Sequence, residues 1–345
     1  MNIIKRKTIV KLTMGVSCQI QLNKPPEDTF CSGEVISGII KYSLDEPMEI
    51  ERIIVSLKGM GDLTLIKRHN KKHSTYTAEE VYVDANEIVQ EKNSIKPAGN
   101  YEIPFRFKLP EKIPPSLKYE KIHGPYCVFC NIKYYIRIKF DNTGYNQSKY
   151  FRKKIAVIST ITPKLSMEPV IYEEKKKLPR LFRSKISTVA IKANILNSVI
   201  PNDGKIEIES EIKNDSYVKV KGVEVKLMEV YTVKPKGYGD IKFYDDVMNC
   251  ESRTSSIKSG ATKVIPLDLI VPTDILSLQN SKIVSRDYVV SITAQLPIPF
   301  RNVVLEIPVQ IGDHTLVKPS EMTGTSPAYF EAMGEKESRV DDGSE

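Results

Sequence analysis

Apolar and polar residues alternate with a period of two along several stretches of the chain. In the clearest stretch, residues 131–140, every second residue from Ile132 to Phe140 is apolar and most of the others are polar. The same alternation recurs at 38–44, 206–212, 288–296 and 303–311. This period predicts antiparallel strands with one buried face, and helical spacing is almost absent. The pattern therefore predicts an all-β protein.

The alternation changes phase between residues 218 and 227. Val218 and Val220 share one parity, whereas Val223, Val225 and Leu227 share the other. One extra residue inserted into a strand reverses which positions face the core. We therefore expect a β-bulge near Gly222.

The spacing of the predicted strands indicates two immunoglobulin-like sandwiches in tandem, because one sandwich usually takes about 100–150 residues. The best break lies between Pro163 and Ser187, a proline- and lysine-containing segment without strand alternation. After about Val317 the sequence turns to Gly, Thr, Ser and acids, which is typical of a flexible tail. The expected organisation is a first sandwich (1–163), a basic linker (164–186), a second sandwich (187–316) and an acidic flexible tail (317–345).

Composition places the chain among soluble globular proteins, with 41% hydrophobic and 27% charged residues. No stretch reaches the roughly 18 uninterrupted apolar residues that a membrane helix requires. Lysines and an arginine interrupt the apolar residues of 1–15, so we expect no signal peptide and a cytoplasmic protein. Five cysteines, an odd number, suit reduced thiols better than a disulfide framework.

Charge is unevenly distributed along the chain. The net charge of the chain is +8. Residues 321–345 carry −5, so residues 1–320 carry +13. The basic side chains of the linker segment are the candidates for contact with acidic tails of membrane proteins or with anionic lipid: Lys175, Lys176, Lys177, Arg180, Arg183 and Lys185. The alternative is a solvated basic face. No nucleic-acid-binding motif accompanies the basic runs, so we expect no nucleic-acid partner.

Residues that could carry catalysis or bind a metal do not form a known motif. Cys127 and Cys130 form a CxxC, but a zinc site needs a second pair or well-spaced histidines, so buried or edge thiols are the favoured interpretation. His69 and His73 lie in a basic, turn-like stretch that predicts a solvated loop. No P-loop, dinucleotide fingerprint or Ser/His/Asp arrangement is present. We expect no enzymatic activity, no cofactor and no metal.

Several blocks resemble the arrestin domain-containing proteins, the α-arrestins. Residues 30–38 (FCSGEVISG) look like their opening strand, and residues 97–110 (PAGNYEIPFRFKLP) resemble their signature PAG-x-x-x-x-PF-x-F-x-LP. In the second half, residues 200–206 (IPNDGKI), 213–216 (KNDS) and 307–312 (IPVQIG) are similar to family blocks in the same order. The resemblance implies two arrestin β-sandwiches and a cytoplasmic adaptor role. Such adaptors act in endocytosis and protein transport at the plasma membrane or endosomes, with cytoplasmic tails of membrane proteins as partners.

The tail also resembles the family. Residues 326–334 are similar to PPxYxEAxxG, in which PPxY recruits WW domains of HECT-type ubiquitin ligases. Here the motif consists of Ser326, Pro327, Ala328 and Tyr329, so the first proline is missing. A proline ring docks in the WW groove and preforms the polyproline turn, so we expect weak WW binding at most. The alternative is a solvated tail without a partner.

Two other functions stay open at this point. A retromer-like subunit shares the fold but docks permanently in a coat complex, and a stable stoichiometric complex would favour it. A ligand-binding β-sandwich is the third possibility, and binding of a soluble sugar would favour it.

Overall fold

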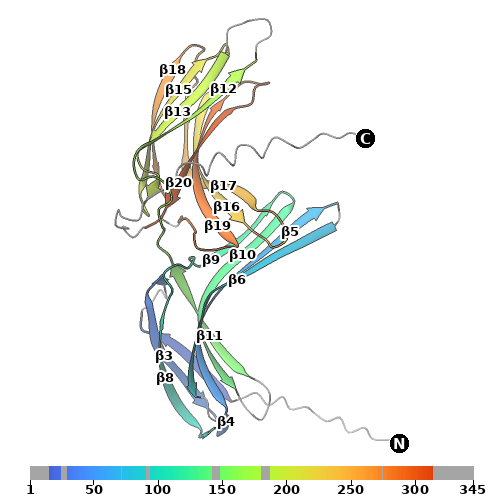
Figure 1. Ribbon diagram of the computed structural model, residues 1–345, viewed down its shortest axis with the longest axis vertical. Helices are drawn as coiled ribbons and strands as arrows, with labels where there is room; N and C mark the ends of the chain where they lie inside the picture. Colours follow the sequence, from blue (N-terminus) through green and yellow to red (C-terminus); the bar gives the residue numbers. More distant parts are fainter. Residues whose placement is uncertain are drawn as a thin grey trace, which may run out of the picture. The chain divides into compact units, whose positions relative to one another are not determined.

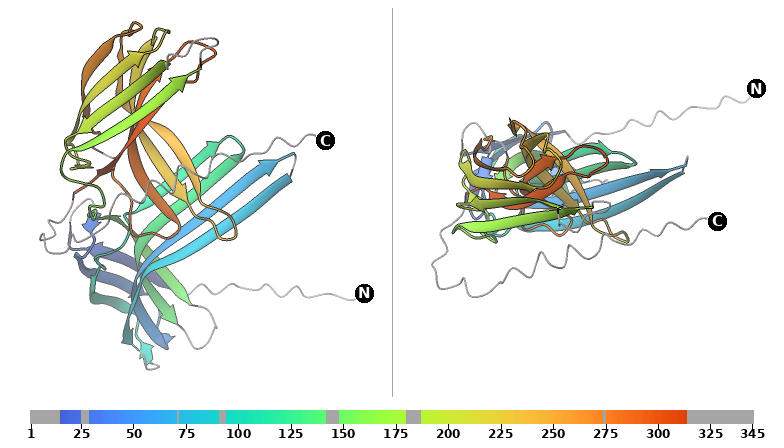
Figure 2. Two further views of the ribbon diagram at one scale, coloured as in Figure 1. Left: turned by 45° about the horizontal axis from the view of Figure 1, so that its top comes forward. Right: turned by 90° about the horizontal axis from the view of Figure 1, so that it is seen from above.

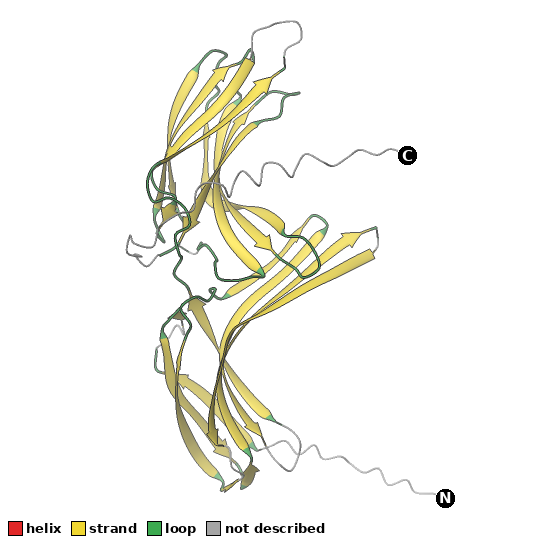
Figure 3. Ribbon diagram, viewed as in Figure 1, coloured by secondary structure: helices red, strands yellow, loops and turns green. Residues whose placement is uncertain are grey.

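The structure is a computed structural model, and it describes residues 15–24, 29–70, 72–90, 94–141, 148–179, 187–273 and 275–313. These residues form strands and loops, with no helix among them (Figure 3). The all-β prediction with two sandwiches in tandem is confirmed (Figure 1). In the described ranges no helix exists that could cross a membrane.

The first sandwich pairs a small sheet with a larger one. The small sheet has the order β1-β3-β8: Val16–Leu22, Val35–Leu44 and Gly99–Lys108. The larger sheet has the order β2-β11-β10-β5-β6, with β9 also pairing with β10: Thr29–Cys31, Lys149–Ile158, Tyr126–Asp141, Arg52–His69, Lys72–Gln90 and, for β9, Leu117–His123. A short ribbon joins β4 (Met48–Ile50) to β7 (Ser94–Lys96).

The second sandwich also has two sheets. One has the order β12-β13-β15-β18: Val170–Leu178, Ser187–Ile195, Lys205–Asp215 and Thr262–Ile270. The other has the order β14-β20-β19-β16-β17: Val199–Ile200, Val303–Ile311, Val284–Gln295, Gly222–Val233 and Ile241–Thr254. β12 lies inside the segment that we predicted as a linker without a strand, so that part of the prediction is wrong. β12 is an edge strand, exposed along most of its length, and therefore lacks a clear alternation.

The residues of the 97–110 block build the first core. Phe105 and Phe107 are buried side chains of β8, as their shared parity predicts. Phe105 is the register partner of Gly38 in β3. A Cβ at Gly38 would lie 2.8 Å from the Phe105 ring and 2.1 Å from the carbonyl oxygen of Gln21, so glycine is required there for close packing.

The block at 213–216 has a polar structural role. The buried amide of Asn214 donates to the carbonyl oxygens of Val218, Ile257 and Lys258. The hydroxyl of Ser216 donates to Asn214 Oδ1. These hydrogen bonds close the loops at one end of the sandwich, which satisfies buried polar groups that would otherwise cost stability.

One local prediction needs correction. The phase change near Gly222 is the start of β16 rather than a bulge, since Val220 makes only an isolated bridge with Ile257. The irregular pairing of β16 with β17 lies farther on, between Lys226 and Met228. Gly33 and Gly99 have positive φ (81° and 153°), and at the turn before β15 the residue with positive φ is Asp203 rather than Gly204.

Candidate functional site

The basic segment before the second sandwich forms an edge strand. β12 pairs with β13, and no other strand of the described ranges pairs along its outer side. Lys175 and Lys177 are exposed, whereas Lys176 is half-buried on the opposite side of the strand. Lys176 Nζ donates to the carbonyl oxygens of Arg301 (3.1 Å) and Asn302 (3.2 Å). Within the described residues, two lysines of the predicted set are therefore free to meet a partner, and Lys176 instead anchors a loop.

The other predicted site residues lie outside the described ranges. Arg180, Arg183 and Lys185 follow the last described residue of β12, and Ser326, Pro327, Ala328 and Tyr329 belong to the tail. Their placement therefore stays a prediction from the sequence.

The two cysteines of the CxxC are buried free thiols in β10. Burial raises the pKa of the Cys130 thiol to about 12, so Cys130 stays protonated at neutral pH. No group of three or more His, Cys, Asp and Glu in the described part of the chain is arranged to hold a metal. His69 and His73 are exposed, but they belong to the paired ends of β5 and β6 beside the hairpin tip rather than to the predicted loop.

Aromatic side chains join the two sandwiches, which belong to a single compact unit. The Tyr119 ring of β9 stacks on the Tyr231 ring of β16, with 3.8 Å between the centroids. His123 stacks on Phe243 of β17 at 4.4 Å and shares a hydrogen bond of 2.7 Å with the Tyr119 hydroxyl. Burial raises the pKa of Tyr231 to about 12. Figure 2 shows β16 and β17 beside β5 and β10 from a second direction.

Charged and polar side chains surround this aromatic contact. Lys121 forms a salt bridge of 2.8 Å with Asp245 across the interface. Beneath it, the half-buried Arg286 donates from Nε to the carbonyl oxygen of Leu276 (2.6 Å) and from a terminal nitrogen to the Tyr231 hydroxyl (3.2 Å). Sequence reasoning missed this interface, because the residues that meet are far apart in the chain and no motif links them.

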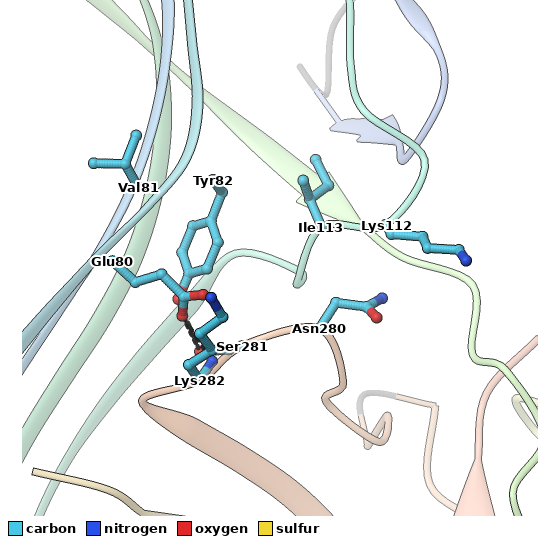
Figure 4. A pocket seen from close by; sticks show the side chains of 8 residues that line it. All are labelled: Glu80, Val81, Tyr82, Lys112, Ile113, Asn280, Ser281 and Lys282. Atoms are coloured by element: carbon cyan, nitrogen blue, oxygen red, sulfur yellow. Dashed lines mark hydrogen bonds between the residues drawn. The ribbon is translucent and has the colours of Figure 1, made fainter.

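A hollow of about 360 Å³ lies at the same junction (Figure 4). Its carboxylate, Glu80, accepts hydrogen bonds from the backbone N–H of Lys282 (2.7 Å) and the hydroxyl of Ser281 (3.2 Å). The Tyr82 hydroxyl also contacts Ser281, at 2.8 Å. Glu80 therefore holds the loop of the second sandwich through Ser281 and Lys282.

Comparisons with known proteins agree with this architecture. Residues 18–164 match the N-terminal domain of arrestin (or S-antigen), and residues 186–316 match its C-terminal domain. The chain belongs to the arrestin domain-containing family. Domains of this family act in general as adaptors and are typically non-catalytic scaffolds.

Two curated relatives carry the family name. Arrestin domain-containing protein 17 of Caenorhabditis elegans is 31% identical over 113 residues, 29% of this chain and 26% of the relative. Arrestin domain-containing protein 1 of Rattus norvegicus is 20% identical over 310 residues, 87% of this chain and 66% of the relative. The matches thus span about a quarter and just under two thirds of these relatives.

Proposed function

We propose that this protein is a non-catalytic cytoplasmic adaptor for the trafficking, endocytosis and sorting of membrane proteins at the plasma membrane or endosomes. The proposal extends the general adaptor role of the family to a particular class of partner, the cytoplasmic tails of membrane proteins. The observation that carries it is the open outer edge of β12 with its two exposed lysines.

An open edge strand presents unpaired backbone N–H and C=O groups that can bind an extended peptide as an additional strand. Backbone hydrogen bonds supply affinity for any extended peptide, and side chains beside the edge supply the preference for one peptide sequence over another. Lys175 and Lys177 are two positions apart, so they lie on the same face of β12. This arrangement favours an extended tail with acidic or phosphorylated side chains at alternate positions.

Affinity purification from cells with the full chain tests the proposal. Membrane proteins with acidic cytoplasmic tails should co-purify, and Lys175→Glu with Lys177→Glu should reduce their recovery at least several-fold. The matched control is Lys219→Glu with Lys221→Glu, an equally spaced exposed pair of the same sandwich. Equal recovery from both variants would contradict the assignment to β12, and a fixed complex of constant stoichiometry would favour a coat component instead.

The link to ubiquitin ligases rests on the degenerate motif at Ser326–Tyr329. A peptide of residues 323–335 should bind a WW domain with a dissociation constant of about 100 μM to 1 mM. Ser326→Pro should tighten binding, because it restores both the docking ring and the polyproline bias, and Tyr329→Ala should abolish it. Titration by fluorescence anisotropy measures the dissociation constants of all three peptides. A wild-type peptide without saturable binding would remove the ligase link and leave the cargo role intact.

A further inference from the structure

The outer face of the larger sheet of the first sandwich carries an unusual pair of arginines. Tyr134, Ile136 and Ile138 of β10 point into the core, so the alternate residues point outward. Arg137 of β10 and Arg152 of β11 are direct register partners on that outer face. Like charges directly opposite each other on a sheet destabilise it, so the pair carries a cost that the fold itself does not explain.

Aromatic rings and a further cation complete this arrangement. Lys154 is the register partner of Tyr135, one row from the arginines. The Arg152 guanidinium lies 5.3 Å from the centroid of the Tyr135 ring and 4.7 Å from that of the Tyr150 ring. Arg152, Lys154 and Tyr150 are exposed. These five side chains (Tyr135, Arg137, Tyr150, Arg152 and Lys154) are here called the arginine patch.

Neighbouring groups offset the positive charge of the arginine patch only in part, because the Asp84 carboxylate attracts Arg137 but forms its ion pair with Lys58. Asp141 is paired with Lys139 at 2.9 Å. In the described part of the chain no carboxylate forms an ion pair with the three cations of the patch, and Arg137 Nε is buried without a hydrogen-bond partner. The site is therefore complementary to a group that brings several negative charges.

The surroundings of the patch indicate what brings those charges. β10 is paired on both sides, by β5 and β11, so its backbone offers no edge to a peptide (Figure 1). The patch lies on open sheet surface, and none of its residues lines the hollow beside Glu80. On the same face, Met60 (41% exposed) and Val81 (67% exposed) are register partners, and Ile158 is also exposed. Cations beside exposed tyrosines and aliphatic side chains suit the headgroup region of a membrane.

We propose that the arginine patch binds the surface of an anionic phospholipid membrane and orients the first sandwich against it. The phosphates and carboxylates of the headgroups would relieve the repulsion between Arg137 and Arg152, while Tyr150 and Met60 reach the interfacial layer. This inference goes beyond the proposed adaptor function, since lipid binding requires neither cargo nor ligase. Failure of either proposal can therefore be recognised independently of the other.

Vesicle sedimentation with the full chain tests the proposal. The protein should bind vesicles of phosphatidylcholine with about 30% phosphatidylserine, should not bind phosphatidylcholine alone, and should dissociate as salt is added. The triple variant Arg137→Gln, Arg152→Gln, Lys154→Gln should bind on the order of 100-fold more weakly, since each cation near an anionic surface contributes about fivefold. Absence of binding by the wild-type chain would overturn the proposal.

Two matched variants separate the patch from charge in general. Lys192→Gln, Lys219→Gln, Lys221→Gln removes the same charge from exposed positions of the second sandwich outside the β12 lysines and should retain nearly all of the binding. Arg137→Lys with Arg152→Lys keeps the charge, and its affinity for the vesicles should stay within about threefold of the wild type. The reason is that the negative electrostatic potential of the membrane surface attracts lysine and arginine alike. Equal losses in both triple variants would overturn the proposal.

A phosphorylated protein partner is the competing occupant. In that case a soluble peptide bearing several phosphoserines would bind the wild-type chain, the arginine triple variant would lose that binding, and the vesicles would not sediment with protein. This outcome would also overturn the membrane assignment. Thermal unfolding controls for folding: removing the Arg137–Arg152 repulsion should leave the midpoint unchanged or raise it.

Discussion

Replacement of Phe105 by alanine tests the packing of the first sandwich most directly. Phe105 is 4% exposed and its ring lies 6.2 Å from the Phe107 ring, centroid to centroid. Truncation of a buried phenylalanine costs about 3–5 kcal/mol, which combines lost transfer free energy with the cavity left behind. Gly38 beneath the ring has no side chain that could move into the space. We therefore expect the loss of unfolding free energy to lie in the upper half of that range.

Urea denaturation measures this loss, followed by circular dichroism or tyrosine fluorescence because the chain has 17 tyrosines and no tryptophan. The matched control is Phe129→Ala in the same sandwich, where the side chain is 45% exposed. Its cost should stay below about 1 kcal/mol. The reasoning about the core would be refuted if Phe105→Ala cost no more than this control.

Two further predictions concern the larger sheet. A Cβ at Gly59 would lie 2.5 Å from ring atoms of the buried Tyr134, so Gly59→Ala should destabilise the protein by about 1–3 kcal/mol or more. The control Gly239→Ala should be tolerated, because a Cβ there has no atom within 4 Å. Urea denaturation midpoints of the two variants measure the difference. Hydrogen bonding from Lys58 lowers the pKa of Asp84 from its usual 3.8. The interaction of Asp84 with Lys58 therefore stabilises the fold at neutral pH, and this stabilisation is lost as pH falls through the lowered pKa. Asp84→Asn should reduce the unfolding free energy by less than about 1 kcal/mol at pH 7, and this difference from the wild type should vanish in acid.

Sequence pattern predicted the strands that have one buried and one solvated face. Residues 131–140 belong to β10, and their alternation matches the burial of each side chain. β12 escaped prediction because Glu174 and Lys176 occupy its inward face and the apolar Ile171 its exposed face, so the sequence shows no clear period of two. The irregularity in β16 was misplaced because it depends on the pairing with β17, which the sequence of β16 alone does not contain.

The candidate site was predicted only in part, for a related reason. Composition indicated lysines as contacts, but which lysine is exposed depends on the parity of a strand that the sequence did not reveal. The opposition of Arg137 and Arg152 depends on the register between two strands, which is a property of the fold. Local patterns carry information on burial, whereas charge juxtaposition arises from pairing.

The aromatic contact between the sandwiches has a practical consequence for dissecting the protein. The core of the first sandwich continues into Tyr231, Val233 and Phe243 of the second, together with side chains of the loop before β19. A fragment that ends at the boundary between the two matched domains would therefore expose an aromatic patch to water, with the risk of self-association. For the same reason, heat should melt both halves in one cooperative transition, and a fragment that fails to bind a partner would say little about which half binds it.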